Sequence, residues 1–209
     1  IYIETPDGVQ LLIDGGPDSS VLRELPEVMP WFDRSLDVVL ATHPDKDHIA
    51  GLVDVLLRYD IDTIVRTENE SDTAVSAAFV LMAAEEAGAI THLARAGDVL
   101  TLGASTTLTL FSPAGNPASW ESNNSSIVAR LTYGEIDFLL TGDAGVGIEE
   151  YLVATYGTAL ESEVLKLGHH GSDTSTSPVF LQTVSPLYAV VSAGAGNRYG
   201  HPHQAGVER

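Results

Sequence analysis

Four acid–base side chains lie within six consecutive positions near the start of the chain. They occupy the segment His43-Pro44-Asp45-Lys46-Asp47-His48. The segment follows an apolar stretch (37–42) that is typical of a buried strand and precedes an amphipathic, helix-like stretch (49–59). In an extended backbone His43 and Asp45 point to the same side, and Asp47 and His48 follow where the helix begins. The spacing predicts a loop that offers ligands to two adjacent metal ions.

Other polar motifs also come directly after apolar, strand-like segments. They are Asp14 after 11–13, Gly142-Asp143 after 138–141, His169-His170 after 164–167, and His201 beyond a last strand at 187–192. A single Asp or His at such a position is usually a turn or surface residue. Because loops at one edge of a sheet scaffold commonly carry binding and catalytic residues, the recurrence predicts that these side chains share one site.

The elements that must position this site fall into two groups of strands. We expect strands at 1–5, 9–13, 37–42, 63–66, 99–102, 106–111, 126–133, 136–141, 164–167 and 187–192. Helices are predicted at 49–59, from a cap at Ser71 or Asp72 to Gly88, at 146–156, and from the Ser177 cap with Pro178 through 184. This order predicts an α/β (α+β) fold, a four-layer αββα sandwich of two mixed β-sheets. No linker divides the chain, so residues 1–209 are expected to form a single domain.

The composition limits the classes of function. The 209 residues are 44% hydrophobic, which is ordinary for a globular protein with a sizeable core. The net charge is −19 and argues against a broad nucleic-acid footprint, which needs a basic stripe. There is no cysteine for a disulfide or thiolate metal site. The sequence opens in mid-strand without a signal-like segment, and we expect it to be excised from a longer, membrane-attached protein.

The motifs resemble those of the metallo-β-lactamase superfamily over almost the whole chain, and they are most similar to the C-terminal hydrolase-like domain of the ComEC-type DNA-uptake (competence) proteins of bacteria. The resemblance is carried by Asp14, Thr42-His43-Pro44-Asp45, Asp47-His48-Ile49-x-Gly51, Asn123-Asn124-x-Ser126, Leu140-Thr141-Gly142-Asp143, Gly168-His169-His170-Gly171-Ser172 and Asn197-x-Tyr199-Gly200-His201-Pro202. It implies the metallo-β-lactamase fold with one or two divalent metal ions, manganese or zinc, at one edge of the sheets.

The resemblance also implies a role for each site residue. His43 and Asp45 would bind one metal, Asp47 and His48 the other, and Asp143 both, with His170 favoured over His169 as the last ligand. The predicted catalytic residues are Asp47, His169 and His201. Asp14 would orient the turn without touching metal. The remaining predictions are that Asn124, Ser126 and Lys46 line the site or contact substrate, against the alternatives of an ordinary turn for Asn124 and Ser126, a solvated Lys46 and an exposed tail position for His201.

Two positions depart from the superfamily pattern. Asp45 stands where a second His is usual, and the region 122–126 lacks the usual third-motif His. Oxygen ligands suit manganese or another hard divalent ion better than three His ligands do. We therefore expect metal binding more firmly than catalysis.

The resemblance implies a metal-dependent phosphodiesterase or nuclease that acts on single-stranded DNA during DNA uptake. Two alternatives stay open: a hydrolase of another ester, such as a lactone or a phosphocholine ester, and a non-catalytic metal-binding scaffold. The implied partners are a phosphodiester substrate and the membrane-channel portion of the same protein, with the domain soluble on the extracytoplasmic side of the cytoplasmic membrane. Single-strand binding normally uses aromatic and basic side chains, for which the candidates are Trp31, Trp120, Tyr199, Lys46, Lys166 and Arg198. His92 is expected to be structural or exposed, and His203 to be a bystander.

Overall fold

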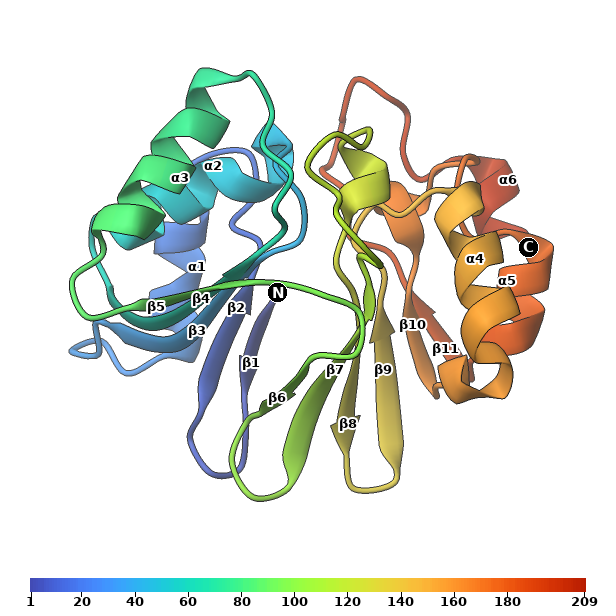
Figure 1. The fold of residues 1–209 in the computed structure, drawn as a ribbon, viewed down its shortest axis with the longest axis horizontal. Helices are drawn as coiled ribbons and strands as arrows, with labels where there is room; N and C mark the ends of the chain where they lie inside the picture. The colour runs from blue at the N-terminus through green and yellow to red at the C-terminus, as the bar shows by residue number, and fades with distance from the viewer.

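The computed structural model describes residues 1–209 as two β-sheets that face each other with helices on their outer sides (Figure 1). The first sheet has the order β1-β2-β3-β4-β5 and the second the order β11-β10-β9-β8-β7-β6. The strands of the first sheet are β1 (Tyr2–Glu4), β2 (Gln10–Ile13), β3 (Ser35–Ala41), β4 (Asp60–Arg66) and β5 (Ile90–Leu93). Those of the second are β6 (Val99–Thr101), β7 (Thr106–Ser112), β8 (Val128–Tyr133), β9 (Ile136–Leu140), β10 (Val164–Lys166) and β11 (Tyr188–Val190).

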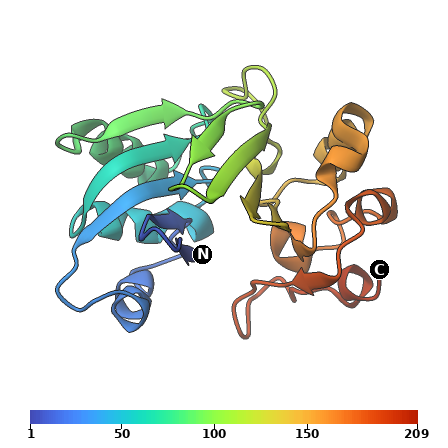
Figure 2. The same cartoon turned by 90° about the horizontal axis from the view of Figure 1, so that it is seen from below.

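The helices complete the four layers. The first sheet is covered by α1 (Val21–Val28), α2 (Lys46–Leu56) and α3 (Ala74–Glu85), and the second by α4 (Val146–Tyr156) and α5 (Pro178–Val184). Short turns are η1 (Asn123–Ser125), η2 (Gly157–Leu160) and η3 (Gly168–Gly171), and α6 (Gln204–Val207) lies near the C-terminus. Figure 2 shows the two halves side by side from below. The predicted αββα sandwich is confirmed.

Three apolar layers hold the sandwich together. Leu11 and Ile13 of β2 face the second sheet and pack with Leu108 and Leu110 of β7. Leu12, between them on β2, lies in the layer beneath α1, α2 and α3. A third layer joins the second sheet to α4 and α5. Strands buried on both faces need a continuous apolar run rather than an alternating one, and residues 11–13 have that pattern.

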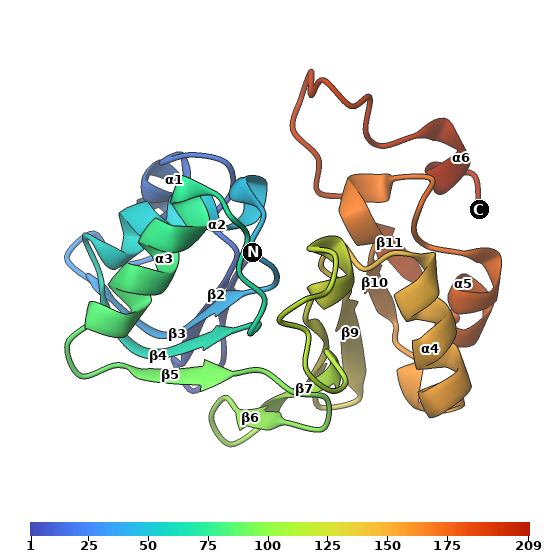
Figure 3. The same ribbon diagram turned by 45° about the horizontal axis from the view of Figure 1, so that its top comes forward.

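Parallel pairing explains why the polar motifs meet. Strand β3 runs parallel to β2 and β4, and β10 runs parallel to β9 and β11. The carboxyl ends of β2, β3, β9 and β10 therefore lie at one end of the sandwich, where the loops after them gather (Figure 3). None of the helices has the length and apolar character needed to cross a membrane.

The structure adds helix α1, strand β5 and the short helix α6, none of which was predicted. Helix α1 contains Pro26 in its interior, and proline weakens a helical pattern because it removes a backbone donor. Strand β5 pairs only with β4, at the edge of its sheet, and is mostly exposed, so it lacks the apolar run of a buried strand. The cap of α3 was also predicted wrongly: Thr73, not Ser71 or Asp72, accepts the hydrogen bond from the Ser76 amide.

Candidate metal centre

The turn between β3 and α2 places the first two histidines together. His43 follows the end of β3 and is 1% exposed; His48 lies in the first turn of α2 and is 3% exposed. Their ring centroids are 4.1 Å apart. Asp45 precedes α2 in an extended conformation, and its Oδ1 accepts a 2.5 Å hydrogen bond from Ser122 Oγ. The turn thus supplies two buried imidazoles and a carboxylate at the rim.

Asp14 holds the turn from the neighbouring loop. Its carboxylate accepts hydrogen bonds from the Thr42 amide and hydroxyl, both at 2.9 Å, and from His48 Nδ1 at 2.8 Å. The loop can approach α2 this closely because two glycines face each other: a Cβ on Gly51 would lie 2.0 Å from the Gly15 carbonyl oxygen. The bond to Asp14 places a proton on His48 Nδ1 and turns Nε2 toward the site.

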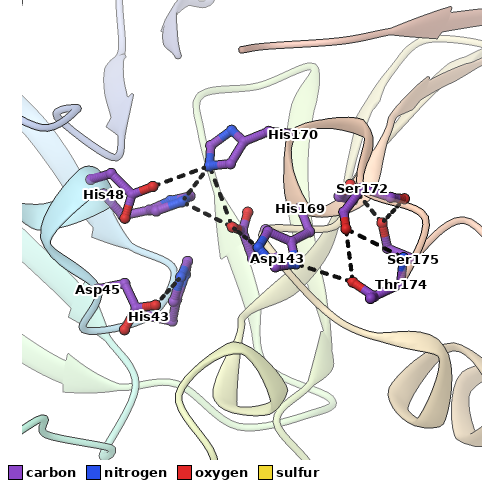
Figure 4. Close-up of polar contacts among 12 residues, drawn as sticks. His43, Asp45, His48, Asp143, His169, His170, Ser172, Thr174 and Ser175 are labelled. Atoms are coloured by element: carbon purple, nitrogen blue, oxygen red, sulfur yellow. Dashed lines mark hydrogen bonds and ion pairs between the residues drawn. The ribbon is translucent and has the colours of Figure 1, made fainter. Parts of the chain in front are cut away.

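Asp143 lies at the middle of the site, after the end of β9. Its side chain is 3% exposed, and its amide donates to Ser126 Oγ at 3.1 Å. Oδ2 lies 3.3 Å from His48 Nε2 and 3.4 Å from His170 Nε2 (Figure 4). Asp143 therefore connects the histidines of the first sheet with those of the second.

The turn with His169 and His170 has an unusual backbone. Both residues are left-handed, with φ of 46° and 55°, a conformation that costs about 1–3 kcal/mol per residue and persists only where surrounding structure imposes it. His170 Nδ1 donates to the Ser192 carbonyl at 2.8 Å, so its Nε2 faces Asp47 Oδ2 at 3.5 Å. His169 Nε2 lies farther out, 3.9 Å from Asp143 Oδ2.

The donor atoms form two groups that could each hold a metal ion, and His48 belongs to both. The groups are His43, His48 and Asp143, and Asp47, His48 and His170, each with its ligand atoms within 4.8 Å of one another. The buried Nε2 of His43 and Oδ1 of Asp143 have no hydrogen-bond partner. Because a buried polar atom without a partner destabilises the fold by about 1–3 kcal/mol, this donor set fits one or two divalent cations.

The charges of His43 and Asp143 suit a cation as well. Burial, with some repulsion from His48, lowers the pKa of His43 to about 4, so its imidazole is neutral at pH 7 and able to ligate a metal. Burial also lowers the pKa of His48, but Asp14 and Asp143 outweigh it and raise the value to about 10. A metal ion at His48 Nε2 would therefore have to displace a proton. Burial would raise the pKa of the Asp143 carboxyl, yet the histidines around it hold that pKa below its usual range.

The other predicted residues lie at different distances from this centre. Ser126 is buried and holds the Asp143 amide, whereas Asn124 lines a separate shallow pocket with Trp120 and Ile148. Asp45 Oδ2 is 3.8 Å from His43 Nε2, and Asp45 belongs to neither ligand group. Lys46 is exposed, as the alternative interpretation had it.

His201 is brought to the site rather than left in an exposed tail. Its ring centroid lies 5.4 Å from that of His169. A pocket of about 140 Å³ is lined by these two residues together with Asp45, Asp47, Asp143, His170 and Tyr199. Lys166 lines a neighbouring pocket, and its Nζ donates to the Gly142 carbonyl at 3.3 Å.

Several residues that support the site were missed at the sequence level. Ser122 and Ser192 bind Asp45 and His170 through contacts that sequence spacing does not reveal. His203 was expected to be a bystander, but it accepts from the Asp173 amide at 3.2 Å and contacts the Tyr199 carbonyl at 3.1 Å. His92 is exposed, as predicted, and its Nε2 lies 2.7 Å from Asp98 Oδ2.

The fold and this donor set define a metallo-hydrolase-like domain, and residues 1–195 match the family model of the metallo-beta-lactamase superfamily. The chain belongs to that superfamily, whose members are generally metal-dependent hydrolases. Among curated proteins it is 36% identical over 171 residues to ComE operon protein 3 of Bacillus subtilis. This alignment covers 82% of this chain and 22% of that protein. It is 52% identical over 85 residues to competence protein ComA of Neisseria gonorrhoeae, covering 41% of this chain and 12% of that protein.

These relatives confirm the resemblance to competence proteins, and the chain spans less than a quarter of the length of either. Among solved structures, Igni18, a metallo hydrolase from the archaeon Ignicoccus hospitalis, aligns with a TM-score of 0.57 at 15% identity, covering 90% of this chain and 76% of that one. At this identity the likeness supports the fold alone.

Proposed function

We propose that this chain is a metal-dependent phosphodiesterase that cleaves single-stranded DNA during DNA uptake. The observation that carries the proposal is the pair of ligand groups sharing His48, with unpartnered buried atoms on His43 and Asp143. DNA is proposed as the substrate because the chain is similar to competence proteins. The segments of those proteins that align with this chain make up less than a quarter of their length. We further propose that the domain works beside a channel portion of the same protein, on the extracytoplasmic side.

In this proposal the ligands come from both halves of the sandwich. His43 and Asp45 hold one ion, Asp47, His48 and His170 hold the other, and Asp143 serves both. Divalent ions in such sites supply an acidified water and offset negative charge on a phosphoryl group. The oxygen-rich rim around Asp45 favours manganese over zinc. Asp14 contributes by fixing the His48 ring through Nδ1.

The remaining groups bind substrate and move protons. Asp47, which is also one of the proposed metal ligands, stays ionised, because the hydrogen bond from His170 lowers the pKa of its carboxyl to about 2. His169 and His201 line the same pocket as Asp47 and Asp143. Either ring can donate a proton to the departing oxygen of a diester, as general acids do from hydrogen-bond distance.

A metal-binding scaffold without catalysis is the second candidate, and one observation favours it. Asp45 stands outside both ligand groups, bonded to Ser122 in the region that lacks the third-motif His. The first ion would then have few ligands and low occupancy. Hydrolysis of another ester, such as a lactone, is the other outcome that the same experiment can reveal.

The experiment combines metal analysis with a cleavage panel. Purified protein loaded with Mn²⁺ or Zn²⁺ is given a labelled single-stranded oligonucleotide, a lactone and a phosphocholine ester. We expect oligonucleotide cleavage with Mn²⁺ that Asp143→Ala and Asp47→Ala abolish, while the exposed-acid control Asp62→Asn keeps full activity. Bound metal without turnover on any substrate would select the scaffold, and cleavage of only the lactone or choline ester would select another hydrolase.

A further inference from the structure

The segment between β11 and α6 is built around one side chain. The Asn197 carboxamide uses all four of its hydrogen-bonding positions: Oδ1 accepts from the amides of Tyr199 at 3.1 Å and His201 at 3.0 Å, and Nδ2 donates to the carbonyls of Gly194 at 2.9 Å and His201 at 2.6 Å. Figure 3 shows this segment at the end of the sandwich where the metal-centre loops gather. The backbone at Tyr199 and His201 is therefore fixed by the loop itself.

A second set of contacts fixes the segment to the turn that carries His170. The His203 amide donates to the Gly171 carbonyl at 3.0 Å, and His203 Nε2 donates to the Tyr199 carbonyl at 3.1 Å. Pro202 packs so closely on Gly171 that a Cβ there would lie 2.7 Å from the proline Cβ. Tyr199 is thereby held at a set place relative to the metal centre.

The planar groups of this segment form a series that runs from solvent to the metal centre. The Arg198 guanidinium lies 4.8 Å from the centroid of the Tyr199 ring. Tyr199 stacks on His201 at 5.7 Å with 23° between the planes, and His201 stacks on His170 at 6.2 Å with 27°. Tyr199 is 57% exposed although it is a large aromatic side chain in an ordered loop. The outer end of the series is open to a further planar group.

Two cavities place Tyr199 where a substrate must lie. The pocket of about 140 Å³ joins Tyr199 to Asp143 and the two histidines of the turn. A second pocket of about 370 Å³ adds Arg198 and Ser192, and both pockets include Asp47, His170, Tyr199 and His201. A molecule bound at the metal centre that extends toward solvent along these pockets meets the Tyr199 ring and the Arg198 guanidinium.

The other aromatic candidates lie elsewhere. Trp31 precedes β3, whereas the metal centre follows that seven-residue strand, a separation of about 20 Å along it. Trp120 lines the shallow pocket near Asn124. With a net charge of −19 the chain also lacks the basic stripe that usually attracts nucleic acid. Beyond the metal centre itself, stacking is therefore the main interaction that this segment offers to a bound strand.

We propose that Arg198 and Tyr199 form a nucleobase subsite, where the base next to the cleaved phosphodiester stacks on the exposed outer face of the Arg198 guanidinium, which the Tyr199 ring supports from behind. The inference rests on the proposed phosphodiesterase function and specifies its substrate as an unpaired strand, because a paired base has no free face to stack. Aromatic rings and guanidinium planes both stack on bases. Since every base has such a face, the subsite accepts any sequence.

The test compares two phosphodiesters that share a leaving group and differ in the base. Mn²⁺-loaded protein is given thymidine 5′-(4-nitrophenyl phosphate) and methyl 4-nitrophenyl phosphate, and the ratio of their kcat/KM values is measured. We expect the wild type to favour the thymidine ester. Tyr199→Ala should lower the ratio about tenfold, as expected for the loss of one stacked base, and Tyr199→Phe should preserve it. Tyr188→Ala, a change at another exposed tyrosine, is the control.

A second measurement does not depend on turnover. Fluorescence anisotropy measures the binding of a labelled oligothymidylate and of a labelled abasic oligomer of equal length. We expect Tyr199→Ala to bind the oligothymidylate more weakly than the wild type does, and to bind the abasic strand equally well. Equal ratios for wild type and Tyr199→Ala, with both esters hydrolysed, would overturn the subsite and leave the phosphodiesterase proposal intact. Hydrolysis of neither ester would remove the proposed function and the subsite with it.

Discussion

Asp14 and His48 lie 34 positions apart in the chain, and His48 Nδ1 donates a 2.8 Å hydrogen bond to Asp14 Oδ2. The bond crosses from the loop after β2 to the first turn of α2. A carboxylate behind an imidazole fixes the tautomer and ring orientation and makes the free nitrogen a better ligand. His48 is the residue that both ligand groups share, so this one contact affects the whole centre.

Asp14→Asn should weaken metal binding without unfolding the protein. Asparagine tolerates the left-handed backbone at this position (φ 56°) but removes the negative charge behind His48. We expect Mn²⁺ affinity, measured by isothermal titration calorimetry, to fall about 10- to 100-fold with an unchanged far-UV circular dichroism spectrum. Asp18→Asn, in the same loop and exposed, is the control. Unchanged Mn²⁺ affinity would show that Asp14 does not position His48.

Metal binding should stabilise the fold, because it gives partners to buried atoms that now have none. At a Mn²⁺ concentration of 100 times Kd the stabilisation is about 2.7 kcal/mol, which raises the Tm of a domain of this size by about 5–10 °C. Differential scanning fluorimetry with and without EDTA measures the shift. Asp143→Asn should lose it, and a shift of the same size in that variant would place the ion elsewhere.

Asp45→His should change the preference between metals. The substitution adds an imidazole to the ion site assigned to His43, Asp45 and Asp143, and nitrogen ligands suit zinc better than manganese. We expect the ratio of Zn²⁺ to Mn²⁺ affinity to rise about tenfold or more, measured by competition with a chelating dye. Ser122→Ala, which removes only the hydrogen bond to Asp45, should leave the ratio near its original value. A rise of the same size in Ser122→Ala would mean that freeing Asp45, rather than adding nitrogen, changes the preference.

The sequence predicted the layers of the fold because its apolar runs are long and the cap of α5 is explicit. Ser177 with Pro178 gave the start of α5, and the limits of α4 were predicted without error. The elements that escaped prediction have weak local signals: α1 contains Pro26, and β5 is an exposed edge strand.

Some residues of the candidate site could likewise be predicted from the sequence, and others could not. Asp14, His43, His48, Asp143 and His170 follow strand ends, and the parallel pairing that joins strand ends is itself predictable from alternating strands and helices. The contacts of Ser122, Ser192 and Asn197 are not, because they depend on how loops from different elements pack. Lys46 lies in the motif by sequence, but the helix turns its side chain toward solvent.

Glu149 of α4 should support the metal centre indirectly, through the loop that contains Ser175, Thr176 and Ser177. It is 1% exposed, and its carboxylate accepts hydrogen bonds from the amides of Thr176 and Ser177, the latter at 2.8 Å. Thr176 and Ser175 in turn bind Gly168, which begins the left-handed histidine turn. Glu149→Ala leaves two buried amides without acceptors, each costing about 1–3 kcal/mol. The turn that carries His169 and His170 would then lose its support.

We therefore expect Glu149→Ala to lower the free energy of unfolding by about 3 kcal/mol, measured by urea denaturation without metal. The adjacent Glu150 is exposed, so Glu150→Ala should change stability by no more than about 0.5 kcal/mol. Glu149→Gln retains one accepting oxygen and should fall between them. If Glu149→Ala were as stable as Glu150→Ala, the loop would be held by its other contacts. In that case Arg209, whose guanidinium donates to the carbonyls of Asp173, Ser175 and Thr176, would be the residue that fixes the turn.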